Sequence, residues 1–529
     1  MSDIEKIIHY HNRTKHHPHA YALSPGYLDW ESQPEAFRRY DDTEKIKLPF
    51  QKTIHLPDYS SLFASGSVSP CSCIQEGIGI LFEHALGLAV WKQFGDSKWA
   101  LRCNPSSGNL HPTEGYLITG DMRDLEGGIY HYNSYHHHLE KRASIITAKF
   151  PQEFFLVGLT SIHWREAWKY GERAYRYCQL DIGHAVASFS YACQMLGWQA
   201  EVLPEVGDKA ITSFLGIDRS DDYGDAERES PDLLLAISCS NKKSKVSSKE
   251  ILSNINKGSW QGKANVLSQF HAHEWTVIEE AEKSTEKPVT KEERWRGDDF
   301  SHFLPTSCED SASNIIKKRR SAQAFDGKTI LKLCDFTRIL DMTLPRKHLS
   351  PWSTLYLKPR INLFLFVHRV EGLESGLYAF IRRPELLKEL KKAMGKEFIW
   401  KQQINLPDEF PFYLLKQGDF KSTARMISGG QDIASDSAFS LGMLAEFNNI
   451  LEEGSWNYRR LFWEAGAIGQ VLYLEAEAAG FRGTGIGCYL DDVFHNLLGL
   501  ENNRFQDMYH FTVGAPLIDS RLQEIPPYS

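Results

Sequence analysis

The sequence predicts an α+β protein made of two related domains, and three observations support this prediction. The chain has 529 residues, of which 42% are hydrophobic, so it exceeds the size at which one core usually divides into domains. Two long, mostly apolar segments recur at a fixed spacing. Short strand candidates accompany each segment, and helices segregated beside strands in this way are typical of α+β domains.

The repeat is clearest in segments 175–197 and 458–480, which carry small and apolar residues on nearly all sides, as a buried helix does. A shift of 283 residues aligns Tyr175 with Tyr458, Arg176 with Arg459, Gly183 with Gly466, and Gly197 with Gly480. A shift of 248 residues aligns Gly128 with Gly376 and Tyr130 with Tyr378. The unit is too long for a solenoid, so we predict two similar halves packed about a pseudo-twofold axis.

The predicted organisation has four parts, of which the N-terminal extension is polar and histidine-rich and the linker is rich in Lys, Ser and Glu. We expect the extension to wrap around the first domain. In the first domain, apolar spacing predicts a helix over 74–94 and strands at 116–119 and 128–132. The four parts are an N-terminal extension (1–60), a first domain (61–240), a helical linker (241–300) and a second domain (301–529).

Charge and composition exclude several classes of protein. The 60 basic and 68 acidic residues give a net charge of −8, which argues against a nucleic-acid partner. The start lacks the apolar core of a signal peptide, and the apolar stretch 78–90 contains Glu83 and His84, so we expect no membrane segment and a cytoplasmic protein. The nine cysteines and the histidine-rich segments show no metal-ligand spacing. We therefore expect free, reduced cysteines and no metal.

The loop at 102–116, RCNPSSGNLHPTEGY, is the most distinctive short stretch in the chain. Pro105 and Gly108 interrupt regular structure, and a strand is predicted to begin after Pro112. Short side chains and accessible backbone amides suit a flat ligand that forms hydrogen bonds. The residues that offer them are Ser106, Ser107 and Asn109.

The string Pro-Ser-Ser-x-Asn-x-His-Pro in this loop resembles the flavin-contacting loop of the nitroreductase fold. With KYGERAYRY at 169–177, it is similar to the SagB-type branch, which includes flavin-dependent azoline oxidases. The resemblance implies two FMN-dependent, nitroreductase-like domains fused in one chain. It also implies that Pro105, Ser106, Ser107 and Asn109 contact the flavin. Such folds usually form homodimers, so fusion would produce a pseudo-dimer, and further homodimerisation stays open.

A basic cluster opens the second half, where RRSAQAF spans 319–325. Arginine presents forked donors that match phosphate oxygens. Alone, the cluster is typical of a solvated helix. It resembles the family's Arg-Arg-Ser-x-Arg-x-Phe signature, which implies that Arg319, Arg320 and Ser321 hold the FMN phosphate. Gln323 stands where the family has a basic residue.

Two further segments of the second half resemble flavin-binding parts of the family. The glycine-rich segment 482–488 follows a helix, so it is not a dinucleotide fingerprint, which requires a preceding strand. In the family the equivalent loop passes the isoalloxazine ring, which implies contacts from Gly485, Ile486 and Gly487. Arg521 resembles a late basic residue at the phosphate, and a solvated terminal arginine is the alternative.

The two halves retain different parts of a flavin site. The loop with Ser106, Ser107 and Asn109 (105–112, the Ser/Asn loop) is present only in the first half. The Arg-Arg-Ser cluster (319–321) is present only in the second. In a family dimer each flavin takes its loop from one subunit and its phosphate clamp from the other. We therefore expect one FMN per chain, with the mirror site decayed.

The candidate catalytic residues are Lys169 and Tyr170, which resemble the Lys-Tyr pair of the azoline oxidases. Oxidation of an azoline requires a base for one proton while hydride leaves to flavin N5, and burial can tune either side chain for that role. The alternative is that the pair caps the central helix and packs the domain interface.

The resemblance implies an FMN-dependent oxidoreductase that transfers a hydride through flavin N5 and oxidises an azoline to an azole on a modified peptide, with oxygen as final acceptor. An NAD(P)H-dependent nitro or quinone reductase acting on a small molecule is one alternative. A cofactor-free scaffold that retains the fold is another.

Overall fold

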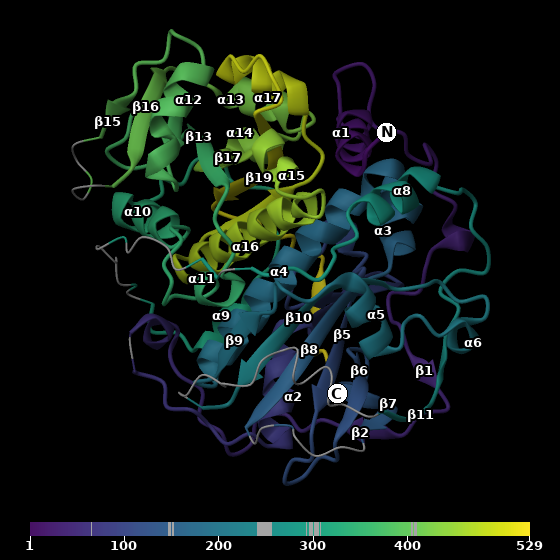
Figure 1. The fold of residues 1–529 in the computed structure, drawn as a ribbon. Coiled ribbons are helices and arrows are strands. Elements are labelled where there is room, and N and C mark those ends of the chain that lie inside the picture. Colours follow the sequence, from purple (N-terminus) through teal and green to yellow (C-terminus); the bar gives the residue numbers. More distant parts are fainter. Residues whose placement is uncertain are drawn as a thin grey trace.

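The computed structural model describes residues 1–64, 66–145, 150, 153–240, 257–292, 294–295, 300, 306, 308–403, 406 and 410–528. Two antiparallel sheets form the centres of two halves, which Figure 1 shows in blue and in green to yellow. The first sheet has eight strands and the second has seven. Most of the apolar core forms one continuous cluster that includes residues of both halves.

The first half places its helices beside the sheet, with α4 crossing one face at the boundary between the halves (Figure 1). The sheet order is β11-β7-β6-β5-β8-β10-β9, with β2 on β7; β11 is Lys257–Trp260 and β2 is Lys45–Lys47. The elements are α2 (Gln75–Ala85), β3 (Leu88–Phe94), β4 (Ser97–Arg102), β5 (Thr113–Thr119), β6 (Gly128–Asn133), β7 (His138–Ile145), β8 (Phe154–Ser161), α3 (His163–Tyr170), α4 (Ala174–Met195), β9 (Gln199–Val202), α5 (Asp208–Leu215), α6 (Ser220–Tyr223) and β10 (Ser230–Ser238).

The second half repeats this order of elements. Its sheet runs β15-β16-β14-β13-β17-β19-β18, so β16-β14-β13-β17-β19-β18 matches β7-β6-β5-β8-β10-β9 position by position. The elements are α9 (Ala312–Lys318), α10 (Leu333–Asp341), α11 (Trp352–Leu355), β13 (Ile361–Val367), β14 (Gly376–Phe380), α12 (Leu387–Ala393), β15 (Lys401–Gln402), β16 (Phe412–Gln417), α13 (Lys421–Ile427), α14 (Asp432–Asp436), β17 (Phe439–Glu446), α15 (Asn448–Glu452), α16 (Asn457–Ala478), β18 (Arg482–Ile486), α17 (Asp491–Leu498) and β19 (Phe505–Gly514). The predicted α+β fold with two related halves is confirmed.

The two central helices, α4 and α16, pack against each other where the halves meet (Figure 1). A Cβ on Gly183 would lie 2.3 Å from the Trp463 carbonyl oxygen, and a Cβ on Gly466 would lie 2.1 Å from the Leu180 carbonyl oxygen. Because both positions lack a side chain, the helix backbones approach closely. These glycines are equivalent in the repeat, so the pseudo-twofold axis passes near this crossing.

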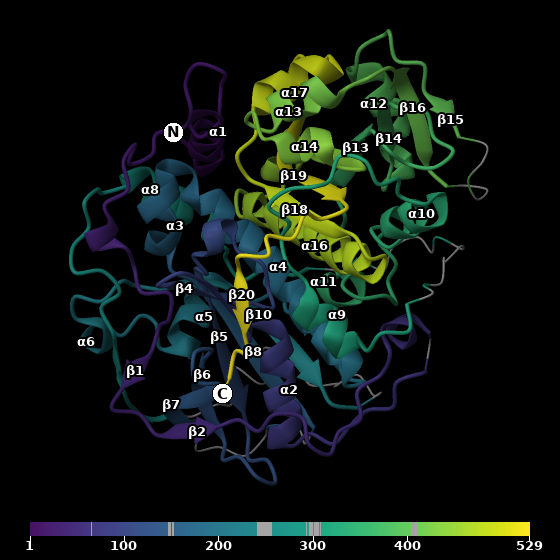
Figure 2. The same cartoon turned by 180° about the vertical axis from the view of Figure 1, so that it is seen from behind.

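The two halves exchange segments. The last strand, β20 (Gln523–Ile525), leaves the second half and pairs with β3 of the first half, where Figure 2 shows it in yellow among blue strands. The N-terminal helix α1 (Asp3–Arg13) lies beside both halves: His11 Nε2 is 3.0 Å from Gln506 Oε1, and Arg13 donates to Glu172. The N-terminal segment, which we expected to wrap around the first domain, therefore contacts both halves.

Three local predictions are wrong. The helix predicted over 74–94 ends at Ala85, because Gly87 allows a close turn (a Cβ there would be 2.5 Å from the Glu83 carbonyl oxygen) and β3 follows. Segment 482–486 forms strand β18 instead of a loop, because it completes the edge of the second sheet beside β19. Cys73 and Cys239 form a disulfide, and their separation of 166 residues matches no spacing motif.

The predicted helical linker (241–300) lies partly outside the described residues, which omit 241–256, 293 and 296–299. From 257 to 295 the chain adds β11 (Lys257–Trp260) to β7 and β12 (Lys263–Ala264) to β1 (Tyr40–Asp41), and only α8 (Thr276–Ser284) is helical. A second N-terminal strand, β2 (Lys45–Lys47), also joins β7. The segment is therefore built into the first half by backbone hydrogen bonds.

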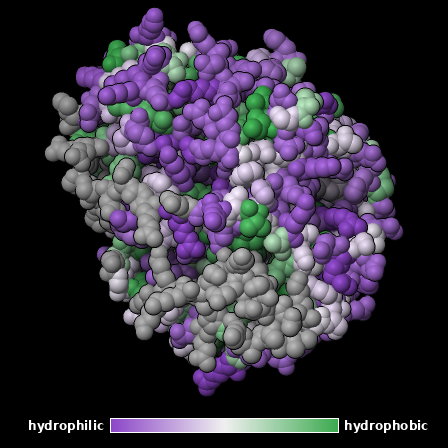
Figure 3. Space-filling view, in the orientation of Figure 1, coloured by the Kyte–Doolittle hydropathy of each residue, from purple (hydrophilic) through white to green (hydrophobic). Residues whose placement is uncertain are grey.

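The molecular surface is mostly hydrophilic on the face drawn in Figure 3, where hydrophobic residues form small separate patches. Within the described residues, every helix is too short or too polar to cross a lipid bilayer.

Candidate functional site

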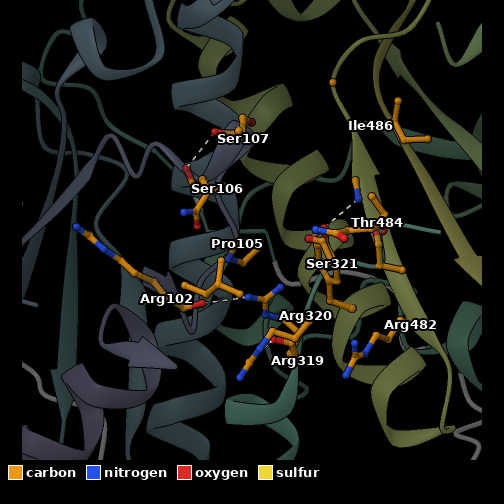
Figure 4. Close-up of a pocket in the computed structure, with 18 of the residues that line it drawn as sticks. Arg102, Pro105, Ser106, Ser107, Arg319, Arg320, Ser321, Arg482, Thr484 and Ile486 are labelled. Atoms are coloured by element: carbon orange, nitrogen blue, oxygen red, sulfur yellow. Dashed lines mark hydrogen bonds between the residues drawn. The ribbon is translucent and has the colours of Figure 1, made fainter. Parts of the chain in front are cut away.

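A cavity of about 530 Å³ lies between the two halves, within the size range of small-molecule and cofactor sites. One wall comes from the loop between β4 and β5, and the opposite wall comes from the segment after α9 together with β18 (Figure 4). The face of α4 forms the base, and residues 517–524 form part of the rim. Neither half encloses this cavity by itself.

The β4–β5 loop is held in an unusual backbone shape by its own side chains. Asn109 and His111 both have positive φ, 62° and 51°, which is uncommon for residues with side chains. Asn109 Oδ1 lies 2.8 Å from His111 Nε2, and Asn109 Nδ2 donates to the Ala100 carbonyl at 2.8 Å. Ser106 Oγ accepts from the His111 amide at 2.8 Å. Strained backbone that several hydrogen bonds maintain is typical of ligand-binding loops.

Arg319 brings an uncompensated positive charge into the cavity wall. Its side chain is 4% exposed and reaches across to the first half, where it donates to the carbonyl oxygens of Cys103 and Arg102 at 3.0 Å each. Nη1 has no hydrogen-bond partner, and Arg319 forms no ion pair within the described part of the chain. Burial lowers the pKa of both Arg319 and Arg320. A bound anion would offset this unfavourable burial of charge.

Hydrogen bonds join the segment after Arg319 to β18. Ser321 Oγ lies 2.8 Å from the Tyr473 hydroxyl, which accepts from the Gly485 amide at 2.9 Å. Thr484 Oγ1 donates to the Ala322 carbonyl at 2.7 Å. Position 485 has no space for a side chain, because a Cβ would lie 1.7 Å from the Tyr509 hydroxyl. The segment 319–323 and β18 thus form one wall of the cavity.

The base of the cavity is one face of α4, on which Tyr177, Asp181 and His184 lie about one turn apart. Tyr177 donates its hydroxyl to the Gly487 carbonyl at 3.0 Å. Asp181 Oδ1 accepts from the Ser107 amide at 3.2 Å. The central helix therefore contacts both opposing walls.

All the predicted cofactor-binding residues except Arg521 line this cavity. They are Pro105, Ser106, Ser107, Asn109, Arg319, Arg320, Ser321, Gln323, Gly485, Ile486 and Gly487. Arg521 lies outside the cavity lining, with a side chain that is 73% exposed and pairs with Asp519 at 2.7 Å. Its neighbours Asp519 and Leu522 reach the rim instead.

The predicted catalytic residues occupy different positions. Tyr170 lines the cavity, and burial raises its pKa well above the ordinary value. Lys169 does not line the cavity, and its ammonium lies 5.3 Å from the centre of the Tyr170 ring. Only Tyr170 is in position to contact a ligand directly.

Several lining residues are absent from the predicted site. Arg102, Asp181, Tyr473, Arg482 and Tyr509 all line the cavity. Burial lowers the pKa of Arg102 to about 10, and its Nε has no hydrogen-bond partner among the described residues. Arg102 and Arg482 lie inside the motif segments 102–116 and 482–488, so the sequence already pointed to their neighbourhood. The other three lie in apolar stretches that carry no motif.

A second cavity, of about 1110 Å³, occupies the position related by the repeat. Pro204, Arg460 and Glu464 line it at the positions equivalent to Gly487, Tyr177 and Asp181. Arg460 pairs with Glu292 at 2.8 Å, and Glu464 with Arg382 at 2.5 Å. These charges neutralise one another within the protein, in contrast to Arg319.

A search against family models finds no match. One curated relative, the trifolitoxin-processing protein TfxB of Rhizobium leguminosarum bv. trifolii, is 32% identical over 132 residues. The match covers 22% of this chain and 35% of the relative, so this chain spans about a third of the length of that protein.

Solved structures extend the similarity to the whole chain. A crystal structure from Anabaena variabilis ATCC 29413, named as a nitroreductase, has a TM-score of 0.71 and 21% identity over 97% of this chain and 99% of that one. A chain of the E. coli microcin synthetase McbBCD complex, solved with truncated pro-MccB17 bound, covers 48% of this chain and 85% of its own with a TM-score of 0.29 and 17% identity. The overlap with the Anabaena protein establishes that the chain has the nitroreductase fold along nearly its entire length.

Proposed function

We propose that the protein is an FMN-dependent oxidoreductase of the SagB type, with one FMN bound between its two halves. The observation that supports this most strongly is the pairing of the Ser/Asn loop of one half with the unneutralised Arg319 of the other half across a single cavity. A flavin mononucleotide has a flat polar ring and an anionic phosphate, and this cavity offers a partner for each.

The residues fit FMN in three places. Arg319 and Arg320 would hold the phosphate, since a guanidinium fork matches phosphate oxygens and Arg319 Nη1 is unpartnered. Ser106, Ser107 and Asn109 would donate to the ring edge. Gly485 and Gly487 line the cavity without a side chain, so their backbone would lie against the ring.

Bound FMN supplies two-electron chemistry by accepting a hydride at N5 and passing the electrons to oxygen. We propose that Tyr170 orients the substrate as a hydrogen-bond donor, because burial keeps its phenol neutral. Lys169 completes the proposed catalytic pair from behind this ring and contributes positive charge.

The proposed substrate is an azoline heterocycle on a modified peptide. The sequence match to a trifolitoxin-processing protein supports a peptide substrate, although it covers only part of that protein. The rim residues Leu517 and Ile518 are 57% and 76% exposed and offer an apolar surface beside the opening for flanking residues of a peptide.

Flavin content tests the cofactor. Purified protein is expected to absorb as oxidised FMN and to release one FMN per chain on denaturation. Two FMN per chain would refute the decayed mirror site. A colourless protein that binds no added FMN would refute the proposal and favour a cofactor-free scaffold.

Stopped-flow absorbance tests the reaction. An azoline-containing peptide is expected to bleach the bound flavin without air, and oxygen is expected to restore its absorbance with formation of the azole. Rapid bleaching by NADH, with none by the peptide, would replace this assignment with a nitro or quinone reductase.

A further inference from the structure

Two buried carboxyl groups meet beside the cavity base. Asp181 of α4 is 2% exposed and lines the cavity, while Glu166 is fully buried on α3, the helix that packs against α4. Asp181 Oδ2 and both Glu166 carboxyl oxygens have no hydrogen-bond partner among the described residues. Two ionised carboxylates buried on packed helices repel each other, and burial disfavours the charge of each, so a proton on the pair is favoured.

The groups around the pair favour this shared proton. Burial raises the pKa of Glu166 well above its ordinary value, and the neighbouring Asp181 raises it further, while Lys169 opposes the shift. Burial raises the pKa of Asp181 to about 7, against the hydrogen bond that its Oδ1 accepts from the Ser107 amide. The other titratable groups that face the pair are Tyr170, Cys178 and Tyr509, and burial raises the pKa of each of them, so all three stay neutral.

We propose that Asp181 and Glu166 hold one proton between them and that Asp181 exchanges protons with the ligand in the cavity, acting as the base of the reaction. This rests on the proposed oxidoreductase function. With bound FMN as the hydride acceptor, the proton that the substrate loses would pass to Asp181 Oδ2, and the pair would then hold two protons. One is released to water after the product leaves. Glu166 acts through Asp181 and is a positioning residue.

This arrangement explains why the cavity needs a base other than Tyr170. The buried phenol stays protonated and can only donate, and Lys169 does not reach the cavity. Asp181 lines the cavity, its buried Oδ2 has no hydrogen-bond partner among the described residues, and Glu166 would store the proton. Ser107 holds the other oxygen, Oδ1, through its amide.

Infrared spectroscopy of the full chain tests the proton without requiring flavin or turnover. Wild-type protein is expected to show the carbonyl band of a protonated carboxylic acid near neutral pH, titrating in two steps as coupled sites do. Asp181→Asn and Glu166→Gln should each remove one of these two titration steps of the carbonyl band. Burial raises the pKa of Asp232 to about 6, so this carboxyl, which accepts from Ser161 and Gln179, adds a separate step. The control Asp232→Asn should remove only that step and retain both steps of the pair. Isotopic labelling of the aspartate carboxyls should shift the carbonyl band of the wild-type protein. This measurement does not depend on whether the variants fold.

The kinetic counterpart is the pH profile of flavin bleaching by substrate. The wild-type rate should rise with pH through about 7, as Asp181 ionises. In Asp181→Asn the rate should fall by about 10²- to 10⁴-fold and lose this pH dependence. A labelled band that does not shift, or an Asp181→Asn profile parallel to wild type, would overturn the proposal. Absence of bound flavin with an intact infrared titration would instead refute only the cofactor assignment.

Discussion

Replacing Arg319 with alanine should weaken FMN binding far more than riboflavin binding. The side chain already donates Nε and Nη2 to two carbonyl oxygens, so only Nη1 is free for a phosphate oxygen. One hydrogen bond between charged groups contributes about 1.5–3 kcal/mol, which corresponds to about a 10- to 150-fold increase in the Kd for FMN. Riboflavin lacks the phosphate, so its Kd should change little.

The assay is quenching of flavin fluorescence on titration into apo-protein. Riboflavin controls for indirect damage, because losing the bonds to Cys103 and Arg102 would disturb both ligands equally. Arg521→Ala is the matched control, since this arginine is exposed and outside the cavity. Equal weakening of FMN and riboflavin, or an unchanged Kd for FMN, would refute a phosphate role for Arg319.

Three further predictions concern stability. Gly466→Ala should lower the free energy of unfolding by about 1–3 kcal/mol, because its Cβ would overlap the Leu180 carbonyl, and urea denaturation measures this. Asp491→Asn should cost about 3–5 kcal/mol by removing the buried partner of Arg173; an equally stable variant would contradict this. Burial alone would lower the pKa of His131, but hydrogen bonds to two carboxylates raise it to about 9. Its contribution to stability should therefore be complete below about pH 6.5 and disappear as pH rises through about 9. His131→Gln should flatten this part of the pH–stability curve.

The sequence predicted the parts of the molecule that local patterns encode. The repeat at 283 residues identified α4 and α16, and the matched glycines of these helices turn out to contact each other's helices. The loop and clamp motifs identified opposite walls of one cavity, because each wall is a continuous stretch of chain.

The features that sequence reasoning missed depend on contacts between distant segments. Tyr473 and Tyr509 reach the cavity from an apolar helix and strand that resemble ordinary core elements. The carboxyl of Glu166 gains its significance only from its proximity to Asp181. Strand β20 has three residues and pairs with β3 more than 400 positions earlier in the chain, so no local pattern signals it.

The crossing of β20 to the first half affects how the cavity can arise during synthesis. The Ser/Asn loop is made early, its arginine partners come more than 200 residues later, and the rim closes last, when 517–525 reaches β3. A gene divided between the halves would therefore yield two pieces, neither with a whole cavity, and only their co-assembly could restore it.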